Sequence, residues 1–204
     1  MKIVLMLLGV MFLGFSNQVE AQKVKKVTVW QDAFVQGGET ASEALGSTTP
    51  QRLRVMKSNG DDKYSRTTYL QFNLKKVEDF SDVELNICVR VYPNKKDASA
   101  NYTYSVYSCD DNKWSESSIT FDNKPEKGEL LATQTLEPKD DNVWVKISLP
   151  ADKVKEMMKQ NKKRKVTFVL SNDDFNKTNM ELISKERTWS NGSSAKREAY
   201  LSFK

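Results

Sequence analysis

A strict alternation of apolar and polar residues is the feature that most constrains this chain. It is clearest at Val83–Val91, where every odd position is aliphatic and most even positions are polar. A period of two places successive side chains on opposite faces of a strand, so one face is buried and the other carries polar groups. The pattern therefore indicates antiparallel strands that pack on one side.

The same alternation recurs along the chain and predicts short strands separated by turn signals. The expected strands lie at 27–35, 53–55, 70–74, 83–91, 102–109, 119–121, 130–136, 143–149, 166–170, 180–183 and 200–203. Only residues 151–161 show helical spacing, with Val154, Met157 and Met158 on one face. The predicted fold class is all-β, a two-sheet β-sandwich of jelly-roll type with one short helix.

The first residues predict a cleavable secretory signal peptide that covers 1–21. Lys2 precedes a short apolar run at 3–15, and residues 19–21 offer small side chains on either side of Glu20. The run is shorter than the roughly 20 apolar residues that span a bilayer, so we expect no membrane insertion after cleavage. We expect an extracellular or periplasmic protein whose residues 22–204 form one domain and act as a monomer.

The sequence contains no histidine, which removes the usual general base, the Ser-His-Asp triad and most zinc sites. Any proton transfer would fall to Glu, Asp, Lys or Tyr. Glu116, Glu181 and Glu186 are available as glycosidase carboxylates, but the sequence does not place two of them face to face. We therefore expect a protein that is not an enzyme, while the many Tyr and Lys residues leave a polysaccharide lyase open.

The 32 basic residues exceed the 27 acidic ones, for a net charge of +5. This excess is spread along the chain without a basic-aromatic motif, which argues against nucleic acid as a partner. An acidic polysaccharide suits a secreted basic protein better, because Arg binds carboxylates in a bidentate manner. The basic run at 162–165 follows the predicted helix, where cations favour the helix dipole, so we interpret it as capping.

Residues 114–125 read W-S-E-S-S-I-T-F-D-N-K-P. We expect a short strand at 119–121 and a Trp114 that plugs one end of the sandwich, in preference to a sugar-stacking Trp. The stretch resembles the W-x-E-x-x-I-T-W-x-N-x-P pattern of DNRLRE-type domains, also called carbohydrate-binding module family 96.

The resemblance extends over nearly the whole chain after the signal peptide. Residues 32–38 are similar to the family's D-A-Y-V-R-x-G, 66–74 to R-R-x-Y-L-K-F-D-L, and 184–186 to S-R-E. The resemblance implies a β-jelly-roll module that binds polysaccharide, with alginate as the known kind of ligand. The chain departs from the family where Arg or Lys is frequent, namely at Gln36, Thr67 and Gln71.

The candidate ligand contacts are basic or aromatic residues on or beside polar strand faces. They are Arg52, Arg54, Lys57, Arg66, Tyr69, Lys185 and Arg187. We expect one basic surface for uronate carboxylates, with Tyr69 stacking on the sugar. Arg66 has an alternative role as a partly buried ion pair with Glu186. A structural or adhesive jelly roll without sugar binding is the alternative function.

Cys88 and Cys109 are the only cysteines, and both lie at the alternate positions of their strands that are predicted to face away from the core. A disulfide between neighbouring strands would be worth on the order of 3 kcal/mol in an oxidising compartment, and two free thiols are the alternative. We expect no required cofactor. A structural calcium ion near Asp32 or the Asp61–Asp62 pair is left open, since these residues also suit turns.

The predicted signal peptide can be tested directly on exported protein. Cleavage after Ala21 would leave Gln22, free or cyclised, as the first residue. Mass spectrometry of the exported protein should find this terminus, and an exported form that retains Met1 would contradict the prediction.

Overall fold

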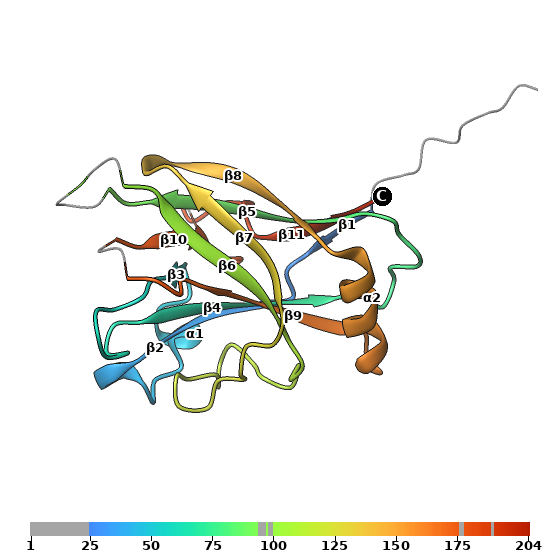
Figure 1. Cartoon of the computed structure of the whole chain (residues 1–204), viewed down its shortest axis with the longest axis horizontal. Coiled ribbons are helices and arrows are strands. Elements are labelled where there is room, and N and C mark those ends of the chain that lie inside the picture. The colour runs from blue at the N-terminus through green and yellow to red at the C-terminus, as the bar shows by residue number, and fades with distance from the viewer. Residues whose placement is uncertain (1–24, 94–96, 98–99, 176–177, 189) are drawn as a thin grey trace, which may run out of the picture.

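Strands dominate the computed structural model, which describes residues 25–204 apart from 94–96, 98–99, 176–177 and 189 (Figure 1). The predicted signal peptide at 1–21 lies outside the described residues. Six described strands form one antiparallel sheet: β1 (Lys25–Thr28), β3 (Arg52–Val55), β5 (Val83–Val91), β8 (Lys139–Leu149), β10 (Met180–Ile183) and β11 (Tyr200–Phe203). Five form the other: β2 (Gln31–Gln36), β4 (Arg66–Asn73), β6 (Tyr102–Cys109), β7 (Leu130–Leu136) and β9 (Lys165–Ser171).

Neighbouring strands in each sheet are mostly not consecutive in the sequence. The six-stranded sheet runs β1-β11-β5-β10-β3, with β8 on the other side of β5, and the five-stranded sheet runs β2-β4-β9-β6-β7. Strands β10 and β11 pair with different halves of β5, at Val89–Val91 and Val83–Asn86 respectively. The predicted two-sheet sandwich of jelly-roll type is confirmed.

The main core lies between the sheets and follows the alternation in the sequence. The odd residues of β5 meet the even residues of β4 and β9, among them Leu85, Phe72 and Phe168. Helix α2 (Ala151–Gln160) lies at one end of the sandwich and adds Val154 and both its methionines to this core (Figure 1). The predicted helix is thus confirmed as part of the core. Within the described residues, no helix has the length and apolar character needed to cross a membrane.

The stretch at 27–35 was expected to be one strand, and this expectation is wrong. The chain leaves the six-stranded sheet after β1 and enters the five-stranded sheet at β2. The switch is visible in the backbone hydrogen bonds, since the Val29 N–H donates to Ala199 O and the Trp30 N–H donates to Gln71 O. A change of sheet needs no break in the alternation, so periodicity alone could not reveal it.

A second apolar cluster covers the outer face of the five-stranded sheet. Trp114 and Ile119, from the connection between β6 and β7, pack on Tyr69 of β4 and Val169 of β9. The Trp114 side chain is only 8% exposed, its Nε1–H donates to Thr167 Oγ1 at 3.1 Å, and its ring meets Tyr69 edge-on at 5.9 Å. The structural role expected for Trp114 is confirmed, although it seals a sheet face and not an end of the sandwich.

The short strand expected at 119–121 is absent from the described structure. The Ile119 N–H donates to Ser115 O at 2.8 Å, which closes a turn in place of a ladder. The Thr120 N–H donates to the side chain of Asn123 at 2.8 Å, so local polar groups satisfy this backbone.

Of the two states left open for Cys88 and Cys109, a disulfide or two free thiols, the structure has two free, buried thiols. Cys88 lies on the outer side of the six-stranded sheet beside Ile183 and Ala195, whereas Cys109 lies in the Trp114 cluster outside the five-stranded sheet. The main core therefore separates them. Burial raises the pKa of Cys109 to about 11, which keeps its thiol protonated.

The role of Trp114 leads to a stability prediction. Trp114→Ala should lower the free energy of unfolding by about 3–5 kcal/mol, because it leaves a cavity in the second cluster and removes one of the donors to Thr167 Oγ1. Trp30→Ala serves as the matched control, since Trp30 is largely exposed and its loss should change stability by about 0.5 kcal/mol or less. Urea unfolding of both variants measures this, and equal small losses would contradict the structural role.

Candidate functional site

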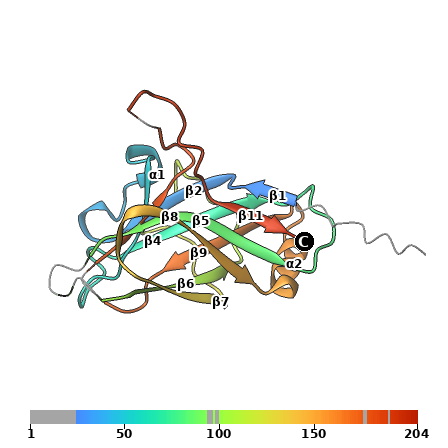
Figure 2. The ribbon, with the colours of Figure 1, turned by 90° about the horizontal axis from the view of Figure 1, so that it is seen from above.

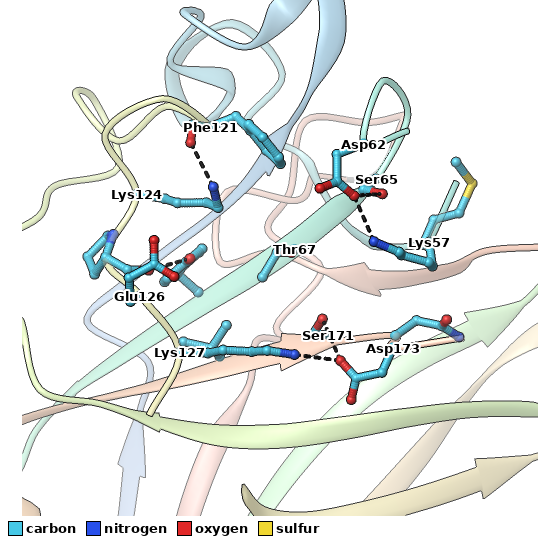
Figure 3. A pocket seen from close by; sticks show the side chains of 15 residues that line it. Lys57, Asp62, Ser65, Thr67, Phe121, Lys124, Glu126, Lys127, Ser171 and Asp173 are labelled. Atoms are coloured by element: carbon cyan, nitrogen blue, oxygen red, sulfur yellow. Dashed lines mark hydrogen bonds and ion pairs between the residues drawn. The ribbon is translucent and has the colours of Figure 1, made fainter. Parts of the chain in front are cut away.

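A pocket of about 510 Å³ opens on the outer face of the five-stranded sheet. Figure 3 shows Thr67 on β4 and Ser171 on β9 along its floor. The segment 121–127 forms one wall, and residues of the 56–65 loop form the other. Trp114 and Ile119 pin the first wall to the sheet, so the pocket depends on the second apolar cluster.

Cations in this pocket are held by defined partners. Lys57 Nζ lies 2.8 Å from Asp62 Oδ1, and Lys127 Nζ lies 2.6 Å from Asp173 Oδ1 (Figure 3). Lys124 Nζ donates to Phe121 O at 3.0 Å and sits 3.7 Å from the centre of the Phe121 ring. An ammonium group has three N–H donors, so each of these lysines keeps donors for a ligand.

The carboxylate beside Lys57 stays charged to a lower pH than an ordinary aspartate, because its pKa is lowered. Hydrogen bonds from Lys57 and then Ser65 lower the pKa of Asp62. The lysine is thereby oriented by a fixed negative charge, and Ser65 holds that charge in place from the base of the loop.

A second hollow of about 500 Å³ adjoins the first, and Met56 and Lys57 line both. Its surface combines cations with aromatic rings. Tyr64 is 51% exposed and Phe175 is 41% exposed, while Lys63 and Arg66 supply positive charge. Exposed rings next to cations are suited to a ligand with both flat apolar faces and anionic groups.

Arg52 and Arg54 lie elsewhere, on the outer face of the six-stranded sheet. Both turn toward Glu181 of β10, which is only 7% exposed, with nitrogen–oxygen distances of 3.4 and 4.0 Å. Arg90 of β5 joins them at 3.6 Å, and the Tyr92 hydroxyl donates to the same carboxylate at 3.3 Å. Three arginines thus share one nearly buried acid, and we call this group the Glu181 cluster.

Arg66 is partly buried, is held by neighbouring side chains and does not pair with Glu186. Its Nε–H donates to Gln36 Oε1 at 2.6 Å, and a terminal nitrogen reaches Met56 Sδ at 3.5 Å. Glu186 instead contacts Lys185. The ion pair offered as an alternative for Arg66 is therefore wrong, and the departure from the family at Gln36 supplies the partner that Arg66 uses.

Lys185 and Arg187 follow β10 in a tight turn. Lys185 Nζ lies 2.8 Å from Glu116 Oε1 and also contacts Glu186, so its charge is already compensated. The Arg187 N–H donates to Ser184 O at 3.2 Å, and Arg187 O accepts from the Ala195 N–H at 2.8 Å. Neither residue lines either hollow.

The stacking role predicted for Tyr69 is wrong. Its side chain does point to the outer face, as the alternation requires, but Trp114 covers it and leaves 1% exposed. The Tyr69 hydroxyl donates to Pro125 O at 2.8 Å, which helps to fix the pocket wall. Gln71 is buried on the same face and donates to Asn112 O at 3.1 Å, so a cation there would be desolvated.

The predicted residues therefore do not form one surface. Lys57, Arg66 and the covered Tyr69 line the hollows, while the Glu181 cluster and the Lys185 turn lie apart from them. Sequence reasoning missed the contributions of Lys63, Tyr64, Lys124, Lys127 and Phe175. Lys124 was within the 114–125 motif, but no periodicity marks the others, because they lie in connections.

One group of acids in the described residues has the spacing of a cation site. Asp32, Glu116 and Glu186 each offer one carboxylate oxygen, and these oxygens lie within 4.8 Å of one another. Two of the glutamates considered as glycosidase carboxylates are thus brought together, but neither lines a hollow. Asp61 and Asp62 accept hydrogen bonds from their own loop, from Lys63 N–H and Ser65.

Comparison with protein families matches carbohydrate-binding module family 96 over residues 23–194. Similar solved structures include two cleaved adhesin domains of Lys-gingipain from Porphyromonas gingivalis W83. The K1 domain is 10% identical with a TM-score of 0.34, covering 87% of this chain and 89% of that one. The K3 domain is 12% identical with a TM-score of 0.34, covering 74% and 69%. No curated protein matches the chain.

The Glu181 cluster leads to a prediction about stability and salt. Glu181→Gln removes the charge that three arginines share, and should cost about 1–3 kcal/mol of unfolding free energy. Part of this loss is repulsion among the arginines, so it should shrink at about 1 M salt, where screening acts over about 3 Å.

The matched control is Glu129→Gln, which removes an exposed carboxylate paired with Lys153 at 2.9 Å. That change should have no measurable effect. Urea unfolding at low and high salt compares the two, and equal behaviour of both variants would show that Glu181 does not organise the arginines.

Proposed function

We propose, from the premise that the chain belongs to carbohydrate-binding module family 96, that it is a secreted, non-catalytic module that binds an acidic polysaccharide across the two adjoining hollows. The observation that carries the proposal is the position of Lys57 in the wall common to both hollows. A sugar chain that occupies both would have to pass its ammonium group.

The aromatic rings support a carbohydrate ligand. Tyr64 and Phe175 present exposed faces in the second hollow, and Phe121 contributes its ring to the first. Carbohydrate rings have apolar faces that pack on such surfaces, while their hydroxyl groups need polar partners nearby. Thr67, Ser171 and Asn172 offer these partners along the floor of the first hollow.

The charges support an acidic ligand with moderate affinity. The two hollows together are lined by five cations, Lys57, Lys63, Arg66, Lys124 and Lys127, and by four carboxylates, Asp61, Asp62, Glu126 and Asp173. A uronate carboxylate would therefore compete with the protein's own acids for Lys57, Lys63 and Lys127. Each contact should contribute modestly, and affinity should arise from several contacts along the chain.

The Glu181 cluster is a less suitable binding surface than the hollows. Its arginines share a nearly buried carboxylate, so part of their hydrogen-bonding capacity is already used. We therefore assign ligand binding to the hollows and a structural role to Arg52 and Arg54.

The test is titration calorimetry with oligomers of alginate, polygalacturonate and a neutral glucan. Lys57→Ala should weaken binding of the acidic oligomers by about 3–10-fold, which corresponds to about 0.7–1.4 kcal/mol, and the loss should shrink as salt rises. Lys162→Ala is the matched control, because Lys162 is an exposed lysine just after α2 and outside both hollows.

The double variant Lys57→Ala with Asp62→Asn separates two causes. If the lysine contacts the ligand, the double variant should remain weak, whereas recovery would show that the single change acted only by exposing the Asp62 charge. Unchanged affinity in Lys57→Ala, or a preference for the neutral glucan, would contradict the proposed ligand. Absence of binding to all three would favour a structural or adhesive role.

A further inference from the structure

Three carboxylates from separate segments of the chain converge at one place. Asp32 belongs to β2, Glu116 to the connection that covers the five-stranded sheet, and Glu186 to the turn after β10. Their oxygens lie within 4.8 Å of one another. Because oxygen ligands lie about 2.3–2.6 Å from Ca²⁺, ligands on opposite sides of one ion are at most about 5 Å apart. The spacing is therefore that of a single shared cation.

Asp32 provides a second and independent observation. Its side chain is only 2% exposed, and while Oδ2 accepts the Lys185 N–H at 2.9 Å, Oδ1 has no hydrogen-bond partner among the described residues. A buried carboxylate oxygen without a partner is costly.

The protein supplies only part of the positive charge that the group needs. Lys185 Nζ lies 2.8 Å from Glu116 Oε1 and contacts Glu186, but Asp32 receives only a backbone N–H from the same residue. Three carboxylates thus face one ammonium group, and the excess charge is negative.

We propose that Asp32, Glu116 and Glu186 form a binding site for Ca²⁺, at which the ion competes with the ammonium group of Lys185. All three ligands are hard carboxylate oxygens, which suit Ca²⁺ and not the softer transition metals. The ion would join β2, the covering connection and the turn after β10. The described residues of the connection from β10 to β11, which project from the sandwich in Figure 2, would then be held at their base.

Competition with Lys185 gives a sharp test that involves no carbohydrate. Millimolar CaCl₂ should raise the thermal midpoint of the wild-type protein above its value in EDTA by about 3–8 °C. Lys185→Met should lower the midpoint in EDTA and bind Ca²⁺ about tenfold more tightly, because the competing ammonium is gone. Calcium should therefore rescue this variant more than it stabilises wild type.

Asp32→Asn combined with Lys185→Met should lose the rescue, since the buried ligand charge is removed. The matched control is Lys57→Met, which breaks an exposed Lys–Asp pair and should respond to Ca²⁺ to the same extent as wild type. Terbium luminescence on folded wild type and on Glu186→Gln gives a direct readout of binding if Lys185→Met fails to fold. Absence of a calcium effect and of terbium binding in wild type, or equal terbium binding by Glu186→Gln, would overturn the proposal.

Discussion

The packing of Trp114 on Tyr69 is the contact on which the functional parts of this protein depend. A β-sandwich requires only that its inner faces be buried, and the main core between the two sheets meets that need. Here the outer face of the five-stranded sheet is also apolar at Tyr69 and Val169, and the connection from β6 to β7 closes over it. The hydrogen bond from Trp114 Nε1–H to Thr167 Oγ1 holds this connection against the sheet.

Because Trp114 packs on the sheet, the connection from β6 to β7 is held in place along its length, and this has two consequences. Its later part, residues 121–127, becomes a rigid wall that faces the 56–65 loop across the floor of β4 and β9. Its earlier part carries Glu116 to the edge of β2, where it meets Asp32 and Glu186. The proposed sugar site and the proposed ion site therefore share one support, and a change that loosens Trp114 should disturb both.

The strands and the helix could be predicted from the sequence because periodicity records which residues face a core. Val83–Val91 and the core face of α2 are examples. The order of the strands in the sheets is not recorded in this way. Cys88 and Cys109 both occupy outward-facing positions of their strands, yet they lie on the outer faces of different sheets. The stacking role predicted for Tyr69 is wrong for a related reason. The side chain does face outward, as predicted, but a segment distant in the sequence covers it. The positions of the basic residues could not be predicted either. Only the folded chain shows that three arginines gather around Glu181 and that Lys57 lies between two hollows.

The most direct test of the account is to map where a uronate oligomer binds. Titration of the isotope-labelled protein, followed by amide NMR shifts, should move signals from the 56–66 loop, from 121–127 and from 171–175, with little change on the six-stranded sheet. The opposite pattern, with the largest shifts at Arg52, Arg54 and Arg90 and none around Lys57, would contradict the assignment of binding to the two hollows.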